Sequence, residues 1–102
     1  MTEYITLPTE FAGRGSQKTF YFTQVDRSGD VALYKKVDVE DKIELYETIL
    51  IKRGGERIFP DGNSIPAKEY YPSDEQFGKM GWAYKTHKEA LIKYNMLLNS
   101  RL

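Results

Sequence analysis

The amino-acid sequence predicts an α+β fold, in which an antiparallel β-sheet of about four strands packs against one C-terminal α-helix. Three observations support this prediction. Residues 18–25 are rich in aromatic and β-branched side chains, as a strand requires. Turn-forming residues at 26–30 then join this run to a second alternating run at 31–37. A capping sequence at 86–89 opens a helical segment near the end of the chain.

The first two strands are predicted to form a β-hairpin. Phe20 and Phe22 share one face of the first strand, and Tyr21 lies on the opposite face. Gly29 supplies a turn residue that tolerates positive φ before Val31 starts the second strand. Because a half-buried sheet needs only one apolar face, we expect Phe20 and Phe22 to lie in the core under the helix and Tyr21 to lie outside.

The third strand is predicted to cover residues 43–53 and to end at Gly54 and Gly55, where we expect the chain to turn. The β-branched residues of this run favour a strand over a helix. Glu47 lies on the same face as four apolar side chains, which are Ile43, Leu45, Ile49 and Ile51.

A second hairpin is expected to follow. Residues 56–59 form a short returning strand, and residues 59–62 fit a type I turn because proline occupies the second position. Pro66 interrupts residues 65–71 and Pro72 closes them. Proline cannot donate a ladder hydrogen bond, so this segment is at most an edge strand.

The C-terminal helix is predicted to begin at the capping box Thr86–Glu89 and to run to about Asn99. Its spacing places Ile92 and Met96 on the side away from the sheet, where we expect them to be exposed. The side chains expected to face the sheet are His87, Ala90, Leu91, Tyr94, Leu97 and Leu98. We expect His87 to be half-buried beside the sheet.

Residues 1–17 are expected to form an irregular or edge-pairing N-terminal arm, and residues 18–102 a single α+β domain. Residues 1–4 show no signal-peptide pattern, and no apolar run approaches the roughly 18 residues of a membrane span. The chain has no cysteine, which excludes disulfides and thiolate metal sites. We therefore expect a cytoplasmic protein that does not enter a membrane.

No catalytic, cofactor-binding or metal-binding residues are predicted. The one histidine, His87, is the second residue of the capping box and has no evident partner for acid–base chemistry. The acidic residues between Asp38 and Glu47 lack the spacing of a calcium loop, which favours a solvated turn. Residues 13–18 contain glycine but precede a strand, whereas a phosphate loop precedes a helix. We expect a protein that is not an enzyme.

The charges cancel over the whole chain but are unevenly placed. Residues 1–51 carry nine acidic and six basic side chains, for −3, and residues 52–102 carry six and nine, for +3. A zero total excludes a polybasic protein. An alternative function is single-stranded nucleic-acid binding, in which exposed aromatics stack on bases and the basic half contacts phosphates. The residues assigned to that alternative are Tyr21, Tyr34, Lys79, Lys85 and Lys88.

Aromatic, proline and glycine residues crowd the segment 70–84, and Trp82 is expected to cover the open end of the sheet. The chain resembles small uncharacterised proteins of tailed phages and mobile genetic elements over roughly residues 20–95. The residues that carry the resemblance are Tyr71-Pro72-Ser73, Phe77-Gly78, Gly81-Trp82 and the capped helix, preceded by Gly29 to Tyr34 and Tyr46 to Ile49. The resemblance brings no catalytic residues. It implies that the protein binds a host or phage macromolecule, as inhibitors of defence or transcription machinery do.

The leading functional prediction is noncatalytic binding of another protein, of host or phage origin, with self-association into a homo-oligomer. The chain has eight Tyr, five Phe and one Trp, more large rings than we expect a core of this size to enclose. The surplus rings and exposed apolar side chains would then form a docking surface. The residues assigned to it are Ile92, Met96, Tyr70, Tyr71 and Trp82.

Overall fold

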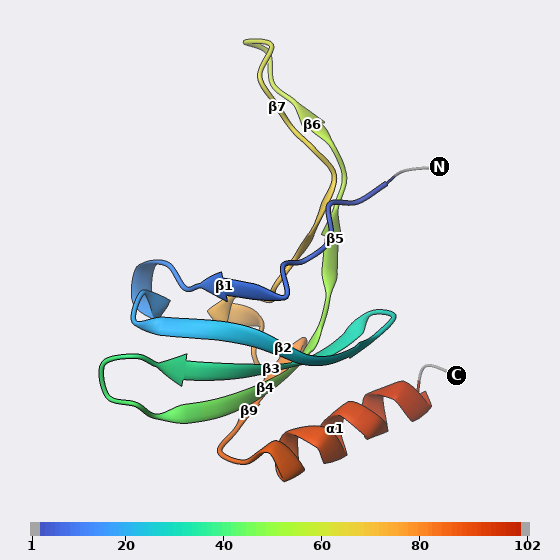
Figure 1. Cartoon of the computed structure of the whole chain (residues 1–102). Coiled ribbons are helices and arrows are strands. Elements are labelled where there is room, and N and C mark those ends of the chain that lie inside the picture. The colour runs from blue at the N-terminus through green and yellow to red at the C-terminus, as the bar shows by residue number, and fades with distance from the viewer. Residues whose placement is uncertain (1–2, 101–102) are drawn as a thin grey trace.

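The computed structural model describes residues 3–100 and has two layers, an antiparallel sheet and one helix, with a hairpin that projects from one end (Figure 1). The strand order in the sheet is β1-β2-β3-β4-β9, and α1 lies across one face. The α+β prediction is therefore confirmed, with five strands in the main sheet. Its elements are β1 (Glu10–Ala12), β2 (Phe20–Ser28), β3 (Val31–Asp38), β4 (Glu44–Leu50), β9 (Gly81–Tyr84) and α1 (His87–Ser100).

The sequence predicted about four strands because the two edge strands of the sheet are segments whose strand pattern is weak. Within the predicted N-terminal arm, β1 pairs with β2, and Phe11 is opposite Phe22. At the other edge, β9 pairs with β4, which places Trp82 opposite Thr48. Each of these edge strands has only three or four residues, too few for a clear period-two pattern.

The face on which Phe20 and Phe22 lie differs from the prediction. Phe22 pairs with Lys36, so it shares a face with Tyr34, whereas α1 packs on the opposite face against Val31 and Leu33. Both phenylalanines therefore point away from the helix. A period of two assigns residues to two faces but does not say which face the helix covers, and here both faces are covered.

Covering both faces creates two separate cores. The helix face buries Val31 and Leu33 with Ala90 and Tyr94. The opposite, aromatic face is covered by the N-terminal segment and by the loop that carries Tyr71 and Phe77. The buried residues of the aromatic face are Leu7, Phe22, Ala32, Tyr34, Ile49 and Ile51.

The prediction that many aromatic rings lie at the surface is mostly wrong. Of the 14 aromatic residues, only four are exposed, because a sheet with two covered faces encloses more rings than a sheet with one. These four are Tyr4, Tyr21, Phe59 and Tyr70.

The C-terminal helix begins as predicted. The N–H of Glu89 donates to Thr86 Oγ1 at 3.2 Å, and that hydroxyl donates to Glu89 Oε1 at 2.9 Å. Ile92 and Met96 are exposed, by 54% and 58%, as the helix spacing predicts. His87 is exposed instead of half-buried, because it occupies the first turn of α1. Its ring is tilted by 45° to the ring of Tyr46, at a centroid distance of 5.4 Å.

The chain does not turn at Gly54 and Gly55. Instead it continues into a projecting arm, which returns along itself (Figure 1). A Cβ on Gly54 would lie 2.8 Å from the ring of Tyr70, so glycine serves a close approach of the two strands. The turn lies at residues 59–62, where the Gly62 N–H donates to the Phe59 carbonyl at 3.0 Å. The arm consists of β5 (Lys52–Gly54), β6 (Arg57–Ile58), β7 (Ser64–Ile65) and β8 (Lys68–Tyr70).

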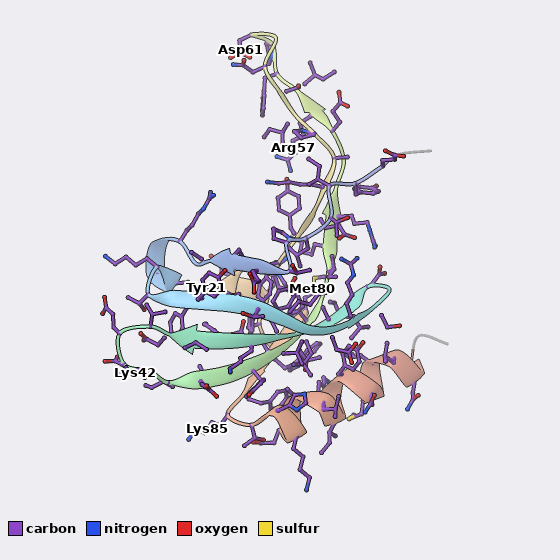
Figure 2. The ribbon with its side chains drawn as sticks, in the orientation of Figure 1. Tyr21, Lys42, Arg57, Asp61, Met80 and Lys85 are labelled. Carbon is purple, nitrogen blue, oxygen red and sulfur yellow. The ribbon has the colours of Figure 1, made fainter. Side chains whose placement is uncertain are left out.

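Solvent surrounds the outer part of the arm. Residues 56–64 are all exposed, Ile58 by 73%, and Figure 2 shows Arg57 and Asp61 along this part, away from the sheet. A two-stranded ribbon is only marginally stable by itself. The arm therefore depends on its base for its position.

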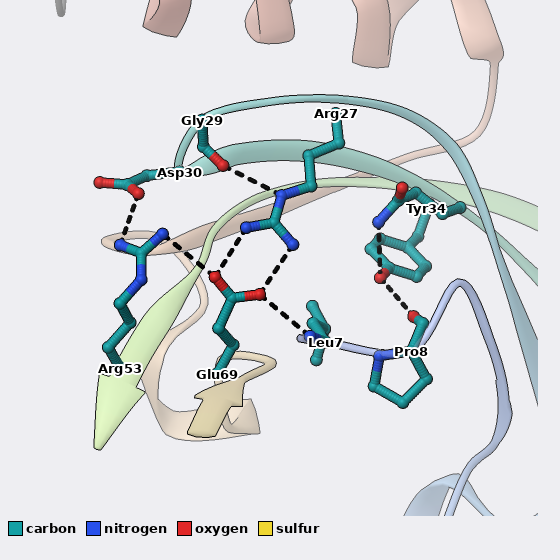
Figure 3. Close-up of polar contacts among 9 residues, drawn as sticks. Leu7, Pro8, Arg27, Gly29, Asp30, Tyr34, Arg53 and Glu69 are labelled. Carbon is teal, nitrogen blue, oxygen red and sulfur yellow. Dashed lines mark hydrogen bonds and ion pairs between the residues drawn. The ribbon is translucent and has the colours of Figure 1, made fainter. Parts of the chain in front are cut away.

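The base of the arm is held by Glu69, a buried carboxylate on β8 (Figure 3). Arg27 donates to both carboxylate oxygens, at 2.8 and 2.7 Å, and Arg53 approaches at 3.1 Å. The N–H of Leu7 donates to the same group at 3.0 Å. These hydrogen bonds, that of Arg27 first, hold the pKa of Glu69 at about 2, below its ordinary value of 4.5, although burial opposes the shift. One side chain thus joins the arm, β2 and the N-terminal segment.

Candidate binding groove

A groove of about 520 Å³ lies on the aromatic face of the sheet, which is within the range of about 300–1,000 Å³ typical of ligand sites. Residues 5–8 and 11–14 form one wall, and residues 68–72 with Phe77 form the other. Phe22, Lys36 and Glu47 lie at its floor, because their strands form the sheet beneath.

The two walls are tied together at both ends. At one end, Ser16 Oγ donates to Asp74 Oδ2 at 3.1 Å. At the other end, the Ile5 N–H donates to the Ala67 carbonyl at 3.0 Å, and the Glu69 N–H donates to the Ile5 carbonyl at 2.9 Å. The N-terminal segment is therefore fixed as a wall, and the width of the groove is set by contacts between residues far apart in sequence.

Stacked rings line the inside of the groove. Phe11 and Phe22 stack at a centroid distance of 4.6 Å with nearly parallel planes. Tyr71 meets Phe11, Phe22 and Tyr34 edge to face at 5.6, 5.4 and 5.2 Å. Edge-to-face contacts are favourable because the positive ring edge meets the negative ring face. Phe11 and Tyr71 belong to opposite walls and Phe22 to the floor, so these contacts join both walls in one apolar surface.

The polar groups at the floor satisfy one another. Lys36 Nζ lies 3.3 Å from Glu47 Oε2, and Tyr71 donates its hydroxyl to Glu47 Oε1 at 2.6 Å. Lys36 also lies over the ring of Phe20, 4.3 Å from its centroid. Burial, then the charge of Glu47, raises the pKa of Tyr71 well above its ordinary value. Tyr71 therefore stays protonated, and the Lys36 charge and both Glu47 oxygens are engaged within the protein.

One polar atom beside the groove is unsatisfied. The side-chain oxygen of Gln17 is buried and has no hydrogen-bond partner among the described residues. Gln17 lines the groove, and Gly13 allows its backbone to approach, since a Cβ there would lie 2.0 Å from the Gln17 carbonyl oxygen. A buried acceptor without a donor costs about 1–3 kcal/mol. The oxygen itself has almost no accessible surface, so a donor brought by a bound molecule would remove that cost only after the Gln17 side chain turned toward the groove.

The predicted protein-binding residues lie in two places. Tyr70 and Tyr71 both line the groove. Trp82 lies on the helix face, half-buried, with Lys93 Nζ 4.2 Å from its ring centroid. Ile92 and Met96 lie on the outer side of α1, so the structure does not bring these three residues to the groove.

The residues assigned to nucleic-acid binding do not form one surface. Tyr34 is fully buried, and its hydroxyl donates to the Pro8 carbonyl at 2.6 Å, so it cannot stack on a base. Tyr21 is 40% exposed but lies on β2, which two strands separate from β9. The exposed lysines Lys79, Lys85 and Lys88 lie in the loop before β9, after it and in α1, and Figure 2 shows Lys85 apart from Tyr21.

Several groove residues were missed in the sequence analysis, among them Phe11, Gln17, Lys36 and Phe77. Alternation on β3 places Lys36 on the same face as Tyr34, but the sequence did not show that this face is buried. Gln17 and Phe77 lie in or beside short turns, where no periodicity shows the direction of a side chain.

The acidic stretch forms a turn. The side chain of Asp38 accepts hydrogen bonds from the N–H groups of Glu40 and Asp41, at 3.0 and 3.2 Å. Within residues 3–100, no group of three or more His, Asp or Glu side chains is placed to hold a metal ion. The described helix is also too short and too polar to cross a membrane.

Comparisons with known proteins do not extend this description. No protein-family model, no curated protein and no solved structure matches the chain.

Proposed function

We propose that the chain is a noncatalytic binding protein whose groove takes a segment of another protein. The observation that carries the proposal is the groove itself, which has an aromatic lining and one unsatisfied acceptor, Gln17. The charged groups at its floor already neutralise one another, which supports binding rather than acid–base catalysis.

The rim of the groove supports a protein as the partner. Tyr70 and Arg14 are exposed there, and tyrosine and arginine are the residue types enriched at protein interfaces and hot spots. The sequence resemblance favours a partner from a phage or its host in the cytoplasm, with an inhibitory effect. The nucleic-acid alternative has less support, because Tyr34 is buried.

A random peptide library displayed on yeast tests the proposal. Peptides enriched on the full chain should bind in the groove, so Tyr70→Ala should raise the Kd of the most enriched peptide about tenfold, measured by fluorescence anisotropy. Phe59→Ala is the control, since Phe59 is similarly exposed and lies outside both the groove lining and the main sheet. Equal Kd values for the two variants, or a library without enrichment, would contradict the proposal.

A further inference from the structure

The edge strand β1 has one side of its backbone open. Gly13 donates its N–H to Phe20, and Gln24 donates to Thr9, so these residues form the hydrogen-bonded pairs with β2. Antiparallel pairing alternates, so the N–H and C=O groups of Glu10 and Ala12 point away from β2. Both residues are exposed.

This open edge borders the groove. Ala12 is paired with Tyr21, and its side chain lies on the face opposite to Phe11, yet Ala12 contributes to the groove lining. Its backbone therefore lies at the boundary of the groove. Phe11, the preceding residue, stacks its ring on Phe22 inside the groove.

The other edge of the sheet is different. The loop before β9 covers the start of that edge, where the Gly78 N–H donates to the Gly81 carbonyl at 2.7 Å and Phe77 forms a bridge with Gly81. Proteins usually protect sheet edges by such cover, by proline or by charge. The outward backbone groups of β1 belong to Glu10 and Ala12, and Ala12 provides neither proline nor charge. Of the two edges, β1 is also the one that borders the groove.

We infer that the partner segment binds in an extended conformation and adds a strand to β1. Its backbone pairs with Ala12 and Glu10, and the side chains on the Phe11 face enter the groove against Phe11 and Tyr71. The Gln17 side chain turns toward the groove, and a side-chain amide or guanidinium of the segment donates to its Oε1. The partner chemistry is thus a short extended peptide with alternate apolar side chains and one such donor. This inference rests on the proposed function of the groove.

Ala12→Pro tests the strand addition, because proline removes the outward N–H and leaves the β1–β2 hydrogen bonds of Phe11 and Gly13 in place. The enriched peptide should bind this variant at least about tenfold more weakly, by fluorescence anisotropy. Ala12→Val is the matched control, since it keeps the N–H and should bind as the unmodified protein does.

The same question can be asked with the peptide altered and the protein unchanged. N-methylation of single peptide amides should weaken binding at every second position, because only alternate amides of an added strand face β1. Gln17→Met should weaken binding of the peptide with the donor and leave unchanged a peptide in which the donor is replaced by an apolar residue.

The outcomes separate the two proposals. If Tyr70→Ala weakens binding but Ala12→Pro binds like Ala12→Val and N-methylation shows no period of two, the groove binds its partner without strand addition. If Ala12→Pro fails to fold, shown by its circular dichroism, the N-methylation pattern alone decides. If Tyr70→Ala has no effect, the groove proposal itself is wrong.

Discussion

At the scale of single residues, Glu69 connects the projecting arm to β2 and to the N-terminal segment. It is buried, it accepts two hydrogen bonds from Arg27, and it fixes the Leu7 N–H of the groove wall. Its lowered pKa of about 2 means that the folded protein favours the ionised form. A lowered folded pKa contributes stability that is complete above the unfolded value near 4.5 and is lost as the pH falls toward 2.

Glu69→Gln tests this contribution. The shift from 4.5 to about 2 corresponds to about 3 kcal/mol, so the variant should have a free energy of unfolding lower by up to that amount at pH 7. The difference from the unmodified protein should shrink between pH 4.5 and pH 2, as the native carboxylate becomes protonated. Urea unfolding at several pH values measures it. Glu75→Gln, at an exposed site, is the control, and a pH-independent difference for Glu69→Gln would refute the argument.

At the scale of elements, one hydrogen bond helps to dock α1 on the sheet. Thr48 is fully buried, and its hydroxyl donates to the Ala90 carbonyl at 2.7 Å. Thr48→Val keeps the shape and removes the donor, so the free energy of unfolding should fall by about 1 kcal/mol. Thr23→Val is the matched control, since Thr23 is half-buried on the same face and donates no hydrogen bond among the described residues. Equal effects of the two changes in thermal or urea unfolding would show that the bond contributes nothing.

Elements with strong local signals were predictable from the sequence. The β2–β3 hairpin, the Thr86 cap and the turn at residues 59–62 depend on neighbours in the chain, which the sequence displays directly. The course of the chain at Gly54 was not predictable. Glycine there signals a turn, but in the structure it makes room for Tyr70, a contact with β8.

At the scale of the whole molecule, the groove is harder to predict than the fold. Tyr70 and Tyr71 were expected at a binding surface, yet the groove depends on contacts such as Ser16 with Asp74, which are 58 residues apart. The excess of rings predicted a docking surface, whereas most of the rings pack into the two cores, six of them on the aromatic face. Composition counts the rings, but only the tertiary arrangement decides how many faces of the sheet are covered.

Self-association is a property of the whole molecule, and substitutions on the outer side of α1 test whether this side forms the contact between copies. Ile92 and Met96 are exposed four residues apart, so changing both to Lys should leave the free energy of unfolding within about 0.5 kcal/mol. If this side forms the expected homo-oligomer, the double variant should sediment as a monomer at concentrations where the unmodified chain associates. Thr9→Lys with Ser64→Lys is the control, because it adds the same charge at exposed positions away from α1. A mass distribution identical in all three proteins would exclude this side of α1 as the contact, since two lysines buried in an interface without partners would strongly oppose association.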